Sequence, residues 1–292
     1  MQRRHIEKEW KQMLRAEQAF LNRNMPARRA GWQEKVAGLV PKKLESTLHT
    51  AFYKAFELIF DKGTSVIEKT YRKEKKQQDY KINAYAAEVR RSRRALRAFG
   101  RDAAVSKGFN MAVSAVEGVG MGILGMGIPD IPLFLGVLLK SIYEIALSYG
   151  FSYDTDEEQI FILKLIQTAV SHDRELAEGN MELNLWMQNL GERAFRAERS
   201  EQIRRTSEAL STELLYLKFV QGLPVIGIVG GISDMAYQKK ISDYAAMKYR
   251  RRFLESRRGE ADAQSGADSI VLFDSAVYRD RDADGEGEHA HL

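Results

Sequence analysis

The 292-residue chain contains no cysteine, and this absence removes several kinds of chemistry. Disulfide bonds, thiolate nucleophiles and thiolate metal sites are excluded, and the composition suits a reducing compartment. The charged N-terminal residues lack the apolar stretch of a secretory signal. We therefore expect an intracellular protein.

Signatures of metal, nucleotide and activated-serine sites are also missing. No two histidines outside the C-terminal region lie at a metal-ligand spacing, and there is no Gly-x-Ser-x-Gly elbow or Walker A lysine. A Gly-x-Gly-x-x-Gly pattern occurs within 118–125, but the strand that a dinucleotide site needs does not precede it. We expect no metal and no cofactor, and the sequence leaves open whether the protein is an enzyme.

Two segments are rich in glycine and aliphatic residues and nearly free of charge. The first spans 118–139, and the second spans 219–233 and ends just before Asp234. Neither has a polar face to offer water, so each must be buried in a core, in a partner or in lipid. Small residues recur every four positions in both, which lets helix backbones approach closely. The residues expected to make this packing are Gly118, Gly122, Gly125, Gly127, Pro129, Pro132, Pro224, Gly227 and Gly231.

The first segment is long enough to span a bilayer, but Pro129 and Pro132 bracket Asp130 near its middle. A carboxylate at the bilayer centre costs about 2.5 to 3.5 kcal/mol, which argues against a straight span. We expect a helical hairpin that turns at Pro129-Asp130. Two placements stay open: the buried centre of a helical bundle, or a wedge that enters one membrane leaflet.

Asp130 and Asp234 are unusual because each carboxylate lies at the end of an apolar segment, within the related sequences Gly-Ile-Pro-Asp and Gly-Ile-Ser-Asp. One interpretation is helix capping, since carboxylates at helix N-termini accept amide hydrogen bonds and complement the helix dipole. The other is functional: the two carboxylates act together as proton carriers or as a cation site. Both interpretations stay open.

Elsewhere hydrophobic residues recur at helical spacing and strand signals are scarce, which predicts an all-α fold. The clearest start is Thr155, where a threonine with Glu158 three positions later forms a capping box. A final helix over 235–254 is expected to have one apolar and one strongly basic side. The other predicted helices end near Met25, run from about Pro41 to Gly63, and cover 181–217 with breaks near Gly179 and Gly191.

A cluster of arginines is interleaved with apolar residues between 73 and 101, and covers more than one face at helical pitch. A basic amphipathic helix can lie on anionic lipid, or it can contact the phosphates of a nucleic acid. It can also be a solvated surface whose arginines pair with nearby acids. No nucleic-acid-binding motif accompanies the cluster, so we consider nucleic acid an unlikely partner. The residues expected to contact lipid are Arg90, Arg91, Arg93, Arg94 and Arg97.

Charge is distributed unevenly along the chain. Residues 259–292 hold nine acidic side chains and two arginines, whereas 1–258 hold 43 basic and 31 acidic residues. The acidic C-terminal region has too little apolar surface to order itself, so we expect a disordered tail over 259–292. The rest of the chain is divided into an amphipathic helix over 1–31 and a helical domain over 32–258.

The chain resembles the EcsC family between about residues 32 and 255. The resemblance lies in Gly125-Met126-Gly127-Ile128-Pro129-Asp130-Ile131-Pro132 and in Leu223-Pro224-Val225-Ile226-Gly227, with Tyr149-Gly150 and Arg252-Phe253-Leu254. It implies a helical protein of unassigned biochemical activity. It also implies a link to ABC transport, since some members are encoded beside ABC transporter components. It supplies no catalytic residues.

We therefore predict an accessory or interaction protein of unassigned activity, linked to ABC transport. It is expected in the cytoplasm, peripherally associated with the inner face of the cell membrane. The partners expected are an anionic membrane surface and a membrane transporter; the oligomeric state is left open. The alternative is a hydrolase acting on a lipid or peptide, with Asp130 or Asp234 as general base.

Overall fold

The computed structural model describes residues 2–24, 42–63, 76–81, 83–84, 131–188, 196–220 and 237–261, and those residues contain helices and no strand. The predicted all-α fold is confirmed. The helices are α1 (Gln2–Asn24), α3 (Lys42–Leu58) with the π-helical turn η1 (Ile59–Gly63), a short helix over 76–81, α7 (Ile131–Ser148), α8 (Asp156–Val170), α9 (Asp173–Gln188), α10 (Arg196–Val220) and a helix over 237–261, called here the C-terminal helix.

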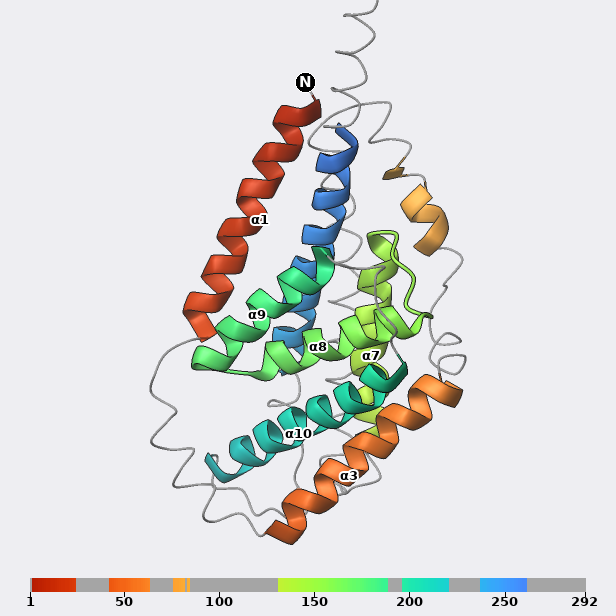
Figure 1. The fold of residues 1–292 in the computed structure, drawn as a ribbon, viewed down its shortest axis with the longest axis vertical. Coiled ribbons are helices and arrows are strands. Elements are labelled where there is room, and N and C mark those ends of the chain that lie inside the picture. The colour runs from red at the N-terminus through yellow and green to blue at the C-terminus, as the bar shows by residue number, and fades with distance from the viewer. Residues whose placement is uncertain are drawn as a thin grey trace, which may run out of the picture.

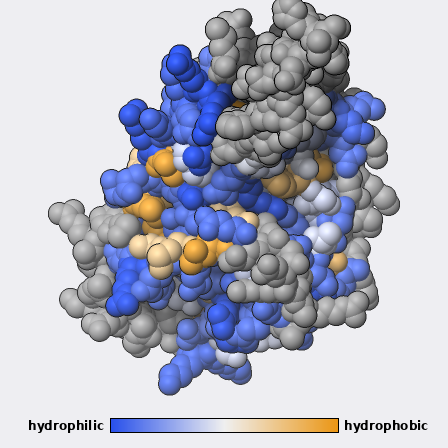
Figure 2. Space-filling model, turned by 45° about the horizontal axis from the view of Figure 1, so that its top comes forward, coloured by the Kyte–Doolittle hydropathy of each residue, from blue (hydrophilic) through white to orange (hydrophobic). Residues whose placement is uncertain are grey.

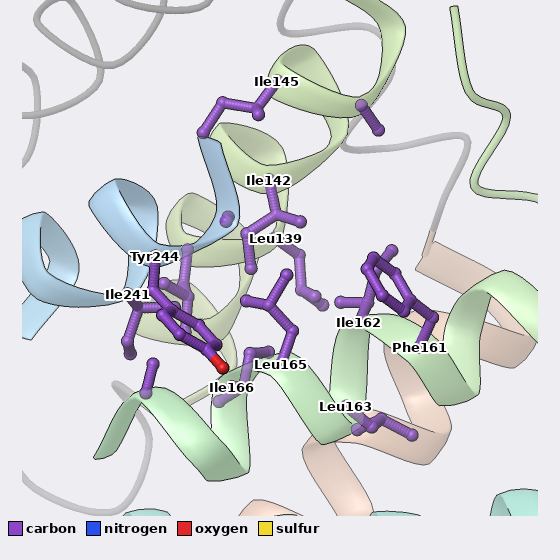
Figure 3. Packing of buried hydrophobic residues seen from close by; sticks show 14 of the residues in the cluster. Leu139, Ile142, Ile145, Phe161, Ile162, Leu163, Leu165, Ile166, Ile241 and Tyr244 are labelled. Atoms are coloured by element: carbon purple, nitrogen blue, oxygen red, sulfur yellow. The ribbon is translucent and has the colours of Figure 1, made fainter. Parts of the chain in front are cut away.

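The helix α8 lies at the centre of the fold. Most of its side chains are fully buried, and it packs against α9 and α10, while α3 packs against α10 and α7. Figure 3 shows Phe161, Ile162 and Leu165 of α8 among side chains of α7 and the C-terminal helix. In Figure 1, α1 lies along the left side, the C-terminal helix runs behind α9 between α1 and α7, and α3 and α10 lie below. A single hydrophobic core therefore joins segments from both ends of the chain.

The ends of α7 and α8 have sequence-specific caps. Thr155 accepts a hydrogen bond from the amide of Glu158 at 3.2 Å, so the predicted start of α8 is confirmed. After α7, Gly150 has a φ of +84°, and the amides of Gly150 and Phe151 bond the carbonyls of Leu147 and Ala146. This is a Schellman motif, in which the left-handed residue is normally glycine because it has no Cβ. It ends α7 sharply.

The predicted break at Gly179 is wrong, because α9 runs from Asp173 to Gln188 without interruption. The glycine serves packing instead. A Cβ at this position would lie 2.9 Å from Oγ1 of Thr168, so its absence lets α9 approach α8 closely. The chain reverses between the two helices at 171–172, where the Ser171 amide caps α8.

The remaining helix predictions agree with the structure where it describes the chain. The first helix ends at Asn24, one residue before the predicted end, and α3 begins one residue after Pro41. The expected break at Gly191 and the acidic residues after 261 lie outside the described residues. The C-terminal helix continues through residue 261, beyond the predicted end at Leu254.

Candidate functional site

Most residues singled out from the sequence lie outside the described ranges, so the interpretations based on them stay predictions. Of that set, Pro132 alone is described: it stands exposed in the first turn of α7, where a proline is tolerated because the amide there has no helical partner. The others are Asp130, Asp234, Arg90, Arg91, Arg93, Arg94, Arg97, Gly118, Gly122, Gly125, Gly127, Pro129, Pro224, Gly227 and Gly231.

The helix that begins within the first glycine-rich segment, α7, and the C-terminal helix, which follows the second, are parallel neighbours. Oγ of Ser141 in α7 lies 3.0 Å from Oγ of Ser242, and the ring of Tyr149 lies 5.9 Å from that of Phe253. In both contacts the two residues are about 100 positions apart. The residue numbers rise together from the first contact to the second, so the two helices run in the same direction. The described parts of the two helices therefore begin at the same end of the pair.

The basic side of the C-terminal helix is turned inward. Lys248 is completely buried, and its Nζ lies 2.5 Å from a carboxylate oxygen of Glu17 in α1 and 2.7 Å from Oδ1 of Asn184 in α9. The Asn184 amide nitrogen donates to the same Glu17 oxygen at 3.1 Å. The second Glu17 oxygen accepts from Arg251 at 2.7 Å. These four side chains, called here the Glu17 network, join three helices in the interior.

Burial and charge shift the pKa values of both central groups in the Glu17 network. Burial raises the pKa of Glu17, but the charge and hydrogen bond of Lys248, with contributions from Arg251 and Asn184, outweigh it and lower the pKa to about 2. Burial lowers the pKa of Lys248 to about 8 against the opposing attraction of Glu17. Near neutral pH the carboxylate is ionised and faces two cations.

A second buried contact joins the C-terminal helix to α8. Glu158 accepts from the Tyr249 hydroxyl at 2.6 Å and from the Arg252 guanidinium at 2.7 and 2.9 Å. The same guanidinium lies 4.2 Å from the ring centroid of Phe151 and 4.5 Å from that of Phe161. Burial, followed by the Glu158 charge, raises the pKa of Tyr249 well above its ordinary value. Glu158 therefore holds two helices together in addition to standing in the first turn of α8.

A third buried cluster contains a histidine that the sequence patterns did not mark. Nε2 of His172 lies 2.7 Å from Glu213 of α10, and the Tyr237 hydroxyl donates to the same carboxylate oxygen. The side chains of His172 and Glu213 are 13% and 7% exposed. A carboxylate contact of this kind orients an imidazole and selects its tautomer. The described residues contain no group of three ligands that could hold a metal ion.

The outer surface of α1 is cationic, in contrast to its buried side. Exposed cations at positions 4, 8, 11 and 15 follow one another at helical spacing, so they form one stripe about 16 Å long. Within the described ranges none of the four takes part in an ion pair. The stripe lies opposite the buried residues Ile6 and Met13. It is called here the α1 stripe, and its residues are Arg4, Lys8, Lys11 and Arg15.

All three glutamates of α1 are paired with cations of the C-terminal helix. Glu7 meets Arg258 at 2.8 Å, Glu9 meets Arg250 at 2.6 Å, and Glu17 belongs to the Glu17 network. Glu9 and Glu17 are nearly fully buried. The carboxylates of α1 are therefore all paired with the C-terminal helix, Glu9 and Glu17 in the interior and Glu7 at the border of the α1 stripe, while the cations of the stripe face outward.

The Glu17 network predicts a loss of stability in acid. The folded-state pKa of Glu17, about 2, is below the ordinary 4.5, so its contribution is complete above pH 4.5 and disappears as the pH falls toward 2. A shift of this size corresponds to about 3 kcal/mol. We expect the free energy of unfolding, measured with denaturant across this range, to fall accordingly. The double variant Glu17→Leu/Lys248→Met should lose this part of the pH dependence; an unchanged slope in the double variant would contradict the prediction.

None of the helices within the described part of the chain has both the length and the apolar character needed to cross a membrane.

Comparison with known proteins gives a family match over most of the chain. The model of the EcsC protein family matches residues 1–254, which include α1 and most of the C-terminal helix. Protein EcsC of Bacillus subtilis (strain 168) is 29% identical over 154 residues, 51% of this chain. The match covers 61% of that relative, so the chain spans about three fifths of its length. No solved structure matches.

Proposed function

The chain belongs to the EcsC protein family, and from that premise we propose that it is an accessory protein that binds peripherally to an anionic membrane surface. The observation that carries the proposal is the separation of charge across α1. Its glutamates are held by cations of the C-terminal helix, whereas the α1 stripe faces outward with no acidic partner among the described residues. A helix with this arrangement is attracted to anionic lipid, and each cation near the surface contributes about 1 kcal/mol.

Two further elements belong to the same proposal. The arginines between 90 and 97 would add to the attraction. Residues 118–130 and 219–233 would supply apolar contact with lipid or with a membrane partner, whereas the rest of the first segment, 131–139, is part of α7 and packs in the core. The partner expected at the membrane is a component of an ABC transporter, as the family resemblance implies. The protein would then sit at the inner face of the cell membrane.

Flotation with lipid vesicles tests the proposal. We expect the full chain to float with phosphatidylcholine vesicles that contain phosphatidylglycerol, to stay behind with phosphatidylcholine alone, and to be released by salt, because screening weakens surface electrostatics. Replacing all four residues of the α1 stripe with glutamine should weaken binding by about a hundredfold or more, since four cations contribute.

A matched variant controls for net charge. Lys42, Lys43, Lys54 and Lys81 are exposed on other parts of the molecule, and replacing them with glutamine removes the same charge. This control should bind nearly as well as the unmodified chain. Failure of the unmodified chain to float with anionic vesicles would overturn the proposed function, and equal loss in both variants would show attraction by net charge without a defined face.

A further inference from the structure

We propose that the protein docks on the membrane along the edge where α1 meets α9, and that Leu14, Met181 and Leu185 enter the lipid headgroup region. The inference rests on the proposed function, because it names the surface and the orientation through which the membrane is bound. The three side chains are called here the apolar edge.

The apolar edge gathers most of the large hydrophobic side chains that the described residues expose. Met181 is 59% exposed, Leu185 is 51% exposed and Leu14 is 39% exposed; Leu58 of α3 is the fourth such residue, at 52%. Met181 and Leu185 are four positions apart on α9, so they lie on one side of that helix. Exposed apolar side chains that gather at one place are typical of an interaction surface.

The three residues belong to two helices, α1 and α9, that lie side by side. Asn184 donates to Glu17 at 3.1 Å, and each residue of the apolar edge lies within one helical turn of that hydrogen bond. Figure 1 shows α1 and α9 on the same side of the molecule, and Figure 2 shows apolar surface among hydrophilic surface on that side.

The cations that would hold this edge against lipid come from α1. Leu14 lies three positions after Lys11 of the α1 stripe, so it flanks the stripe on the helix surface. The exposed charges of α9 add no attraction, since Arg174 is paired with Glu178 at 2.6 Å and both Glu175 and Glu182 are acidic, so the attraction comes from the α1 stripe. An amphipathic surface binds a bilayer interface in this way: its cations lie at the level of the lipid headgroups, and its aliphatic side chains lie just below the headgroups.

A lipid surface fits the apolar edge better than a protein or a nucleic acid. A stable dimer interface uses about 20 to 30 residues on each partner, far more than three exposed side chains. Nucleic acids attract cations through their phosphates, but the phosphate backbone gives exposed aliphatic side chains no apolar surface to pack against. A bilayer takes up isolated apolar side chains without a complementary partner surface.

The absence of cysteine makes a direct test possible. Single-cysteine variants Met181→Cys, Leu185→Cys and Leu58→Cys of the full chain are labelled with an environment-sensitive fluorophore and mixed with vesicles containing phosphatidylglycerol. We expect a blue shift, and quenching by lipids that carry a quencher at headgroup depth, at positions 181 and 185. The label at position 58, on an equally exposed leucine of α3, should stay unchanged.

The outcomes separate the two proposals. If the labelled proteins float with anionic vesicles but positions 181 and 185 show no shift, or if position 58 shifts equally, the docking edge is wrong while the proposed function stands. If neither the unmodified chain nor any labelled variant binds the vesicles, both the proposed function and the docking edge are wrong. If sedimentation shows a dimer that is lost in Met181→Gln/Leu185→Gln, and the labels do not respond to vesicles, the edge is a contact between two copies and the inference is overturned.

A second pair of variants measures the contribution of the edge itself. Met181→Gln/Leu185→Gln should weaken binding to anionic vesicles by roughly tenfold or more, because the apolar surface that leaves water is lost. The salt dependence should stay as in the unmodified chain, since the α1 stripe is intact. Leu58→Gln should bind unchanged; equal binding by the double variant would contradict the inference.

Discussion

Replacing Glu17 with alanine should lower the free energy of unfolding by about 3 to 5 kcal/mol. The substitution leaves the Lys248 ammonium completely buried, with Asn184 as its remaining hydrogen-bond partner. Desolvation of a charge is costly when no opposite charge is near, so the loss exceeds that of an ordinary hydrogen bond. Urea denaturation of the variant and the unmodified chain, followed by circular dichroism, measures the difference.

A control variant and a double variant test whether the loss of stability comes from the buried charge that Glu17→Ala leaves without its partner. Glu178→Ala removes a glutamate from an exposed pair with Arg174, and should change stability by less than about 1 kcal/mol. Glu17→Leu/Lys248→Met replaces both buried charges with apolar side chains, and should recover much of the loss, since Arg251 keeps its contact with Glu255 at 3.1 Å. A double variant no more stable than Glu17→Ala would show that the pair itself, rather than the stranded charge, is what matters.

The Glu17 network shows what the sequence could and could not predict about the interior. The period of Ile6, Met13 and Phe20 predicts α1, and the same period places Glu9 and Glu17 on its buried side. That signal could have marked both glutamates as buried. Their partners could not be predicted in the same way, because Lys248 lies 231 positions from Glu17 and no local pattern links them.

The C-terminal helix shows a different limit. Its basic and apolar residues predict two sides, but periodicity does not say which side meets solvent. Lys248, Arg251 and Arg252 are held between helices because glutamates on α1 and α8 face them. The basic side of this helix is thus used for packing between helices.

Gly179 and Gly150 illustrate why glycine is ambiguous in a sequence. Gly150 ends a helix with a positive φ, whereas Gly179 stands inside α9 and makes room for Thr168 of α8. Local sequence contains no information about the neighbour that a missing Cβ accommodates. The glycines of the two apolar segments raise the same question of turn against close packing, and their interpretation stays a prediction.

The largest contrast between sequence and structure concerns Glu158, which the sequence pattern interprets as the third residue of a capping box. Were capping its only role, removing it would cost about as much as removing the cap, or about 1 kcal/mol. The structure instead places its carboxylate on Tyr249 and Arg252. Loss of the carboxylate strands a buried hydroxyl and a guanidinium that is 11% exposed.

We therefore expect Glu158→Ala to lower the free energy of unfolding by about 3 kcal/mol, and Thr155→Ala by about 1 kcal/mol. The two residues are three positions apart at the start of the same helix, so fraying of α8 contributes to both. Tyr249→Phe should cost about 1 kcal/mol, because Arg252 keeps its bonds to Glu158. Unfolding the three variants with denaturant measures their free energies of unfolding and ranks the losses. A loss in Glu158→Ala no greater than in Thr155→Ala would mean that the carboxylate acts on its own helix alone, and that the bridge to the C-terminal helix contributes little to stability.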